Sequence, residues 1–238
     1  DIMALPILDT ATYELTLPSS DTVVKFRPFI VKEEKILLQA LEAGDSKGIT
    51  TALKDIVNTC TYGSVDVTNI PTFDLEYIFL QIRSKSVGEK VKIKVLCPDD
   101  KVTYAEHEVD LTKVEVVVDD EHTSEIVVND KVKMIMSYPT IESVDPTADS
   151  KSMKTDKLFE IIGKTVAQII DGEVIHNAKD YTQKELRDFI DTLDSGVFVK
   201  LQKFYSTMPR LAHEIVVTNP KTKVESTVML QGLSDFFG

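Results

Sequence analysis

The sequence changes from helical to β-strand periodicity at Lys90-Val-Lys-Ile-Lys-Val-Leu-Cys-Pro-Asp-Asp-Lys-Val102. Val91, Ile93 and Val95 alternate with lysines, and this period of two is typical of a strand with one buried face. The Pro-Asp-Asp that follows supplies turn residues, and the alternation resumes over residues 102–109. The stretch therefore predicts an antiparallel hairpin after a helical segment, which indicates the α+β class.

The residues before this hairpin predict an earlier hairpin and three amphipathic helices. Residues 12–17 and 23–27 alternate on either side of Pro18-Ser-Ser-Asp21, which has turn chemistry. Apolar residues then recur with helical period over residues 32–43, in a second segment capped by Ser46, and over residues 73–84. Gly44 is expected to end the first helix.

The residues after it predict strands, then helices, then a last hairpin. Residues 89–138 hold about five short strands, which we expect to form one antiparallel meander. Residues 141–155 are rich in Ser, Thr, Asp and Pro and predict a linker or exposed loop. Helices are expected over residues 156–170, from the capping box Thr182-Gln-Lys-Glu185, and over 197–205, followed by strands at 214–217 and 224–230. The predicted parts are therefore residues 9–140, the linker 141–155, and residues 156–238.

Two hairpin turns match each other in sequence. Ile93-Lys-Val-Leu-Cys-Pro-Asp-Asp-Lys-Val102 and Ile215-Val-Val-Thr-Asn-Pro-Lys-Thr-Lys-Val224 share Ile, Pro, Lys and Val at the same offsets. Each half also reads as three helices followed by a hairpin, which an internal duplication would explain. Proline at the second position of a type I turn would produce the same match by physics alone, so both explanations stay open.

The composition limits the class of partner. The chain has 238 residues, 42% of them hydrophobic, and 27 basic against 39 acidic residues give a net charge of −12. Nucleic acid and anionic membranes would repel such a chain, and we expect neither as a partner. Two cysteines are too few for a disulfide framework, so Cys60 and Cys97 are expected to be free thiols.

A search for chemistry finds only weak candidates. Cys97-Pro-Asp-Asp100 resembles half of a zinc knuckle, with His107 or His122 available to complete it, but one thiolate with scattered hard ligands favours an ordinary turn. Nucleophile elbows and glycine-rich phosphate loops are missing from the sequence. We expect no catalytic residue, no metal and no cofactor, and a metal-dependent enzyme is the remote alternative.

Two groups of residues are singled out on physical grounds. Arg27 lies at a strand-to-helix junction, where it can pair with Glu33 or Glu34 in the first helical turn; a solvated charged face is the alternative interpretation. Leu233, Phe236 and Phe237 fall within one helical turn at the end of the sequence. These three are candidate protein-interface residues, unless they dock into the chain's own fold.

Four segments together resemble a known family: Phe26-Arg-Pro-Phe-Ile-Val-Lys-Glu-Glu-Lys-Ile-Leu-Leu38, Ile82-Arg-Ser-Lys-Ser-Val-Gly-Glu89, Phe204-Tyr-Ser-Thr-Met-Pro-Arg210 with His213, and Leu230-Gln-Gly-Leu-Ser-Asp-Phe-Phe237. In this order they are similar to the baseplate hub assembly proteins of T4-like tailed bacteriophages.

The resemblance implies a function by protein binding. It implies a non-enzymatic assembly factor for the central hub of a contractile tail baseplate, with a structural hub subunit retained in the virion as the alternative. The implied partners are other baseplate hub proteins and a second copy of the chain. The implied location is the host cytoplasm during phage assembly, or the virion baseplate.

Overall fold

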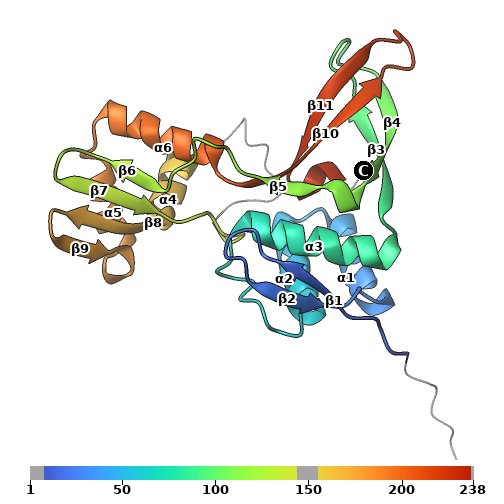
Figure 1. The fold of residues 1–238 in the computed structure, drawn as a ribbon, viewed down its shortest axis with the longest axis horizontal. Helices are drawn as coiled ribbons and strands as arrows, with labels where there is room; N and C mark the ends of the chain where they lie inside the picture. The colour runs from blue at the N-terminus through green and yellow to red at the C-terminus, as the bar shows by residue number, and fades with distance from the viewer. Residues whose placement is uncertain (1–7, 144–154, 237–238) are drawn as a thin grey trace, which may run out of the picture.

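The computed structural model describes residues 8–143 and 155–236, which fold around two hydrophobic cores. The larger core is built from both ends of the chain, and the smaller one from its middle (Figure 1). We call the two parts the first lobe and the second lobe. The α+β class is confirmed, because helices and several small antiparallel sheets occur in separate parts of the chain.

The first lobe begins with a hairpin and three helices. Strands β1 (Tyr13–Thr16) and β2 (Val23–Phe26) pair antiparallel and lead into α1 (Val31–Ala43), α2 (Ser46–Cys60) and α3 (Thr72–Val87). Gly44 ends α1 in the left-handed conformation, with φ of 64°, as predicted. The cap of α2 is Asp45 instead of Ser46, because the Asp45 carboxylate accepts a hydrogen bond from the N–H of Gly48 at 2.9 Å.

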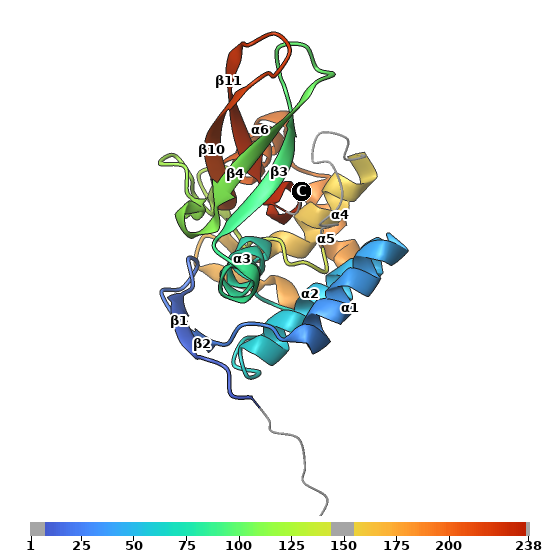
Figure 2. The ribbon, with the colours of Figure 1, turned by 90° about the vertical axis from the view of Figure 1, so that its right-hand side faces the viewer.

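Two hairpins stand on the other side of α3 and pack against each other (Figure 2). Strands β3 (Lys90–Leu96) and β4 (Tyr104–Asp110) form the first one, and β10 (Arg210–Thr218) and β11 (Glu225–Gln231) form the second. The short strand β5 (Glu115–Val117) follows the 3-10 turn η1 (Leu111–Lys113) and pairs with the start of β10. Alternate residues of both hairpins, among them Ile93, Val95, Ile215 and Val217, are buried between them.

The two matching turns adopt the same conformation and touch. In each, the lysine before the shared valine is left-handed, with φ of 57° at Lys101 and 64° at Lys223. Its N–H donates to the carbonyl four residues earlier, at 2.9 Å in both turns. The buried amide of Asn219 donates to both oxygens of Asp99, at 3.0 and 3.1 Å, and the Thr222 hydroxyl donates to Asp99 at 2.5 Å. The hairpin tips are thus joined by residues at which the two turns differ in sequence, Asp99 on one side and Asn219 and Thr222 on the other.

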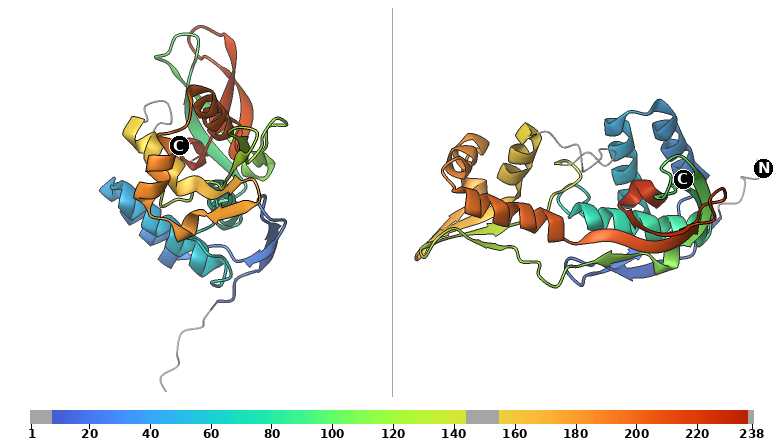
Figure 3. Two further views of the ribbon diagram at one scale, coloured as in Figure 1. Left: turned by 90° about the vertical axis from the view of Figure 1, so that its left-hand side faces the viewer. Right: turned by 90° about the horizontal axis from the view of Figure 1, so that it is seen from above.

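The second lobe is one antiparallel sheet with three helices. Strands β6 (Glu125–Val127), β7 (Val132–Met136), β8 (Val166–Asp171) and β9 (Val174–Asn177) pair in this order. Helices α4 (Thr155–Thr165), α5 (Gln183–Ile190) and α6 (Ser195–Thr207) contribute to the core on one side of the sheet (Figure 3). The turn η3 (Ala178–Asp180) leads to α5, whose capping box between Thr182 and Glu185 is confirmed.

Strand pairing corrects several predictions. The five strands of residues 89–138 exist, but they belong to three sheets and form no single meander. The helix expected over residues 156–170 ends at Thr165, and the β-branched residues beyond it form β8, which pairs with both β7 and β9. The predicted division at 141–155 does not separate the cores, because β6 and β7 pair with β8, and β10 and β11 return to the first lobe. Residues 144–154 of the predicted linker lie outside the described part.

The helical halves of the predicted duplication also differ. A hairpin, β8 and β9, interrupts the second set of helices, and its last hairpin packs in the first lobe. The two halves therefore resemble each other in their hairpin turns and differ in the arrangement of their helices. In the turns, the shared proline and the left-handed lysine account for the similarity of the sequences.

Removing the Asn219 amide should loosen the hairpin tips. We expect Asn219→Ala to lower the free energy of unfolding by about 1–3 kcal/mol, since its partners at the turn lose hydrogen bonds. Lys221→Ala, at an exposed side chain of the same turn, should change it by less than about 0.5 kcal/mol. Urea denaturation of both variants measures this, and equal midpoints would contradict a structural role for the Asp99 contact.

Candidate interaction surfaces

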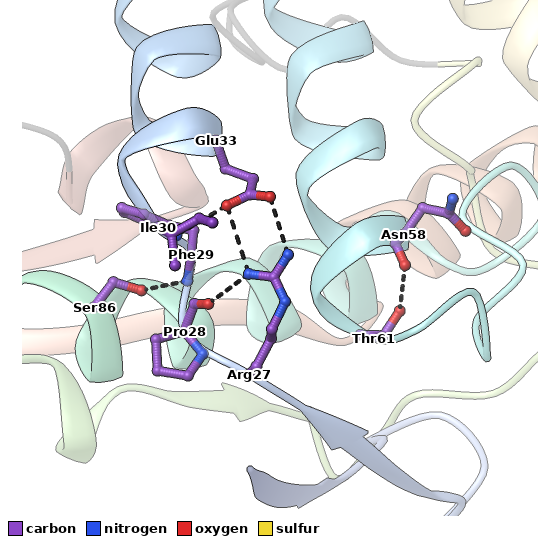
Figure 4. A network of polar contacts seen from close by, with 8 residues as sticks. All are labelled: Arg27, Pro28, Phe29, Ile30, Glu33, Asn58, Thr61 and Ser86. Carbon is purple, nitrogen blue, oxygen red and sulfur yellow. Dashed lines mark hydrogen bonds and ion pairs between the residues drawn. The ribbon is translucent and has the colours of Figure 1, made fainter. Parts of the chain in front are cut away.

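Arg27 joins β2 to α1 through an almost buried ion pair. Its guanidinium donates to the Glu33 carboxylate at 2.9 Å, and their side chains are only 15% and 5% exposed (Figure 4). Arg27 also donates to the carbonyl of Pro28 at 2.9 Å, while its own N–H donates to the carbonyl of Cys60. The second oxygen of Glu33 accepts the N–H of Ile30 at 2.9 Å, so one carboxylate caps α1 and anchors it to the strand.

The pKa of Glu33 reflects these contacts. Burial acts to raise the pKa, but hydrogen bonds from Arg27 and from the N–H of Ile30, together with the guanidinium charge, hold it below its usual value. Glu34, the other predicted partner, lies one residue further and makes no ion pair among the described residues. Of the two acidic residues, only Glu33 contacts Arg27.

The anchored helix α1 presents an uncovered apolar stripe. Val31, Leu38 and Leu41 are 78%, 51% and 40% exposed. Successive residues of an α-helix are rotated by 100°, so these three lie within an arc of about 80°, which also contains the partly exposed Glu34. Only Glu33 and Leu37 of α1 are buried, next to this arc. We call the three residues the α1 stripe; its apolar area is available to another protein.

The second lobe has an apolar surface of its own on the face of the sheet that points away from its core. Four apolar side chains lie there, in two neighbouring cross-strand rows: Val127, Ile135, Ile170 and Ile175. Val127 and Ile175 are 42% and 57% exposed. Between them, Lys133 pairs with Glu125 at 2.9 Å, and Gln168 donates to Asn177 at 3.0 Å. We call this surface the open face.

The C-terminal residues do not form the predicted interface. The turn η4 (Leu233–Phe236) packs in the first lobe, where Leu233 is 4% exposed and Phe236 is fully buried. Two residues of α3 hold it: Arg83 donates to the carbonyl of Phe236 at 2.6 Å, and Glu76 accepts the N–H of Leu233 at 3.3 Å. Docking into the chain's own core therefore replaces the interface for these two residues. Phe237 lies outside the described residues.

The two cysteines and His122 are surrounded by residues of the fold. Cys60 and Cys97 are free and buried, and burial raises the pKa of Cys60 to about 11. His122 lies between Thr207, at 2.9 Å from Nδ1, and Tyr138, at 3.1 Å from Nε2, and burial lowers its pKa. Residues 8–143 and 155–236 contain no group of three or more His, Cys, Asp or Glu side chains that could hold a metal ion together. None of the helices described there has the length and apolar character to cross a membrane.

The described surface thus offers apolar areas on two lobes. In a comparison with known families, the model of the T4 bacteriophage base plate protein family matches residues 10–238, and the chain belongs to that family. No curated protein and no solved structure matches the chain significantly. The resemblance drawn from the four segments is confirmed at the level of the baseplate family.

Sequence reasoning found Arg27 and Glu33 but missed both apolar surfaces. The apolar residues of α1 mark it as an amphipathic helix: Ile36, Leu37, Ala40 and Leu41. Their arc is wide, and this width was the signal that the core would bury only part of the apolar surface of the helix. The open face could not be found, because β6, β7, β8 and β9 come from segments whose pairing the sequence did not predict.

Glu33 and Glu34 form a matched pair for testing the Arg27 contact. We expect Glu33→Ala to lower the free energy of unfolding by about 2–4 kcal/mol, since it leaves a mostly buried guanidinium without its carboxylate. Glu34→Ala should cost less than about 0.5 kcal/mol. Thermal and urea unfolding decide the matter, and a Glu33→Ala variant as stable as Glu34→Ala would mean that the pair is only a solvated contact.

Glu76 should make stability depend on pH. Burial raises its pKa from 4.5 to about 7, so the folded protein holds a proton that the unfolded chain releases between these values. The contribution of the neutral carboxyl is complete below pH 4.5 and is lost as the pH rises through 7. Glu76→Gln, which keeps an acceptor for Leu233, should therefore be more stable than the wild type by about 1–3 kcal/mol above pH 7.

Melting temperatures across this pH range measure the effect. At pH 4.5 and below, the gap between Glu76→Gln and the wild type should close. Glu42→Gln, which changes an exposed carboxylate on α1, is the control for net charge. A constant gap at every pH would show that Glu76 does not titrate in this range.

Proposed function

We propose that the chain is a non-enzymatic assembly factor for the central hub of a contractile phage tail baseplate, and that it acts by binding other hub proteins. Membership of the baseplate family supports the setting. The observation that carries the proposal is the α1 stripe, which is apolar, exposed and held in place by the buried Arg27–Glu33 pair. The proposed site of action is the host cytoplasm during phage assembly.

The α1 stripe has the properties of an anchor for a partner. Fully burying a Val or Leu side chain contributes roughly 1.5–3 kcal/mol, so the three residues together can supply most of the energy of a moderately tight complex. Because Glu33 fixes the start of α1, the stripe is presented without a large cost in conformational entropy. A rigid helix face of this kind suits a groove or a second helix on the partner.

The second lobe provides a second apolar surface at a distance from the α1 stripe. The open face and the α1 stripe belong to different lobes with separate cores. A chain with one apolar surface on each lobe can bind two hub proteins at once and raise their effective concentration for each other. Bringing components together in this way is the work of an assembly factor, and it requires no catalytic group.

A second candidate function is a structural hub subunit that stays in the virion. The observation that favours it is the total of exposed apolar surface, since permanent interfaces are more apolar than transient ones. Quantitative mass spectrometry of purified particles separates the two. A stoichiometric signal for this chain supports the subunit, and its absence supports the assembly factor.

The α1 stripe can be tested by complementation of a phage that lacks this gene. We expect Leu38→Glu with Leu41→Glu to reduce the titre by at least about tenfold while leaving the melting temperature within about 2 °C, because both side chains are exposed in the isolated chain. Gln39→Glu, on the same helix outside the stripe, should complement fully. Normal baseplates in the absence of the gene would refute the role in assembly altogether.

A further inference from the structure

Strand β11 is a long sheet edge without the usual protection. It is an outer strand of the sheet β11-β10-β5, and its seven residues pair with β10 without a bulge (Figure 1). Proteins protect such edges with lysines, prolines, bulges or short strands, because the free N–H and C=O groups otherwise bind another strand. The sequence Glu225-Ser-Thr-Val-Met-Leu-Gln231 contains no lysine and no proline, and its edge is capped at the C-terminal end, where the Asp235 carboxylate accepts the N–H of Gln231 at 2.8 Å.

The other outer strands of the described sheets are charged or short. The outward face of β3 carries Lys90, Lys92 and Lys94, and that of β4 carries Glu106 and Glu108 directly opposite. The remaining outer strands, β1, β2, β5, β6 and β9, are only three or four residues long. Two long and regular edges without lysine or proline remain among the described strands: β11, and residues 213–218 of β10, which lie beyond the three-residue pairing with β5. Of the two, only β11 is an outer strand of its sheet along its whole length.

The strand is complementary to a second copy of itself. When two copies of β11 run antiparallel with Val228 facing Val228, Thr227 faces Met229 and the charged Glu225 faces the neutral Gln231. No like charges meet along the strand. Thr227 and Met229 are exposed on the outer face, so the dimer has two such cross-strand pairs, each with Thr227 from one copy and Met229 from the other.

The ends of the strand favour the same arrangement. Lys221 and Lys223 are exposed in the turn before β11, and Asp235 is exposed in η4 after it. Antiparallel pairing brings the basic turn of each copy to the acidic end of the other, and does so twice by symmetry. A chain with net charge −12 repels its own kind, so this local complementarity selects the orientation.

We infer that the chain forms a two-fold dimer in which the β11 strands of two copies pair antiparallel about Val228, joining their sheets into one. This interaction is separate from the α1 stripe and the open face, and it leaves both exposed. The dimer therefore doubles the number of surfaces available to hub proteins.

The register can be tested with two variants that differ at one position. Thr227→Lys with Met229→Lys places the introduced lysines opposite each other twice in the dimer, whereas Thr227→Glu with Met229→Lys places a glutamate opposite a lysine. Within one chain, Met229 faces Glu214 and Thr227 faces Val216, so neither pair of substitutions opposes like charges in the hairpin. Sedimentation equilibrium over a wide concentration range measures the mass of each protein.

The wild type should approach twice the mass of 26.6 kDa as its concentration rises. The first variant should dissociate at least about tenfold more readily than the wild type, and the second should recover dimerisation. Val102→Lys, at an exposed residue of the other hairpin, controls for net charge. Circular dichroism and melting curves confirm that the variants fold.

Two results would overturn the inference. One is a wild-type chain that stays monomeric at every concentration, which would leave the edge to an extended segment of another protein. The other is a dimer equally stable in both variants, which would place the contact elsewhere on the chain.

Discussion

The structure depends on the burial of α3 over more than half of its circumference. Ile78, Phe79 and Leu80 are consecutive and fully buried, and three consecutive residues of a helix cover an arc of about 200°. A helix that is apolar over so wide an arc cannot be covered by packing on one side alone. Helix α2 covers one side of α3, and β5, η1 and β10 contact it on the other. Because β10 comes from residues 210–218, the chain has to return to the first lobe after completing the second.

This return explains the position of the second lobe. The chain leaves the first lobe after β5 and comes back at β10, and these two strands pair with each other at Arg210 to Ala212. Most residues between them form the separate sheet and helices, while residues 139–142 return to the first lobe, where Ile141 is buried in its core and Thr140 forms a β-bridge with Pro71. An insertion that leaves and re-enters through neighbouring strands keeps its own core and presents its own surface. The open face and the α1 stripe can therefore serve different partners.

Contacts of ionisable side chains fix the relative positions of several elements in this molecule. The buried Arg27–Glu33 pair sets the start of α1, Asp99 joins two hairpin tips, and Glu76 and Arg83 hold η4 on α3. The first contact is local in sequence, whereas the other contacts join segments more than 100 residues apart.

The sequence by itself determined much of the local structure: the end of α1 at Gly44, the strand alternation, the capping box at Thr182, and Glu33 or Glu34 as the acidic residues within reach of Arg27. These features arise from residues close together in the chain, where backbone preferences and short-range hydrogen bonds dominate. Only the tertiary structure decided which strands pair, that residues 156–170 divide into α4 and β8, that both chain ends share a core, and that Leu233 and Phe236 are buried. The physical reason is that an apolar residue has no preferred partner in the sequence. Burial rewards any complementary surface, so the choice among distant segments is made by the packing of the whole chain.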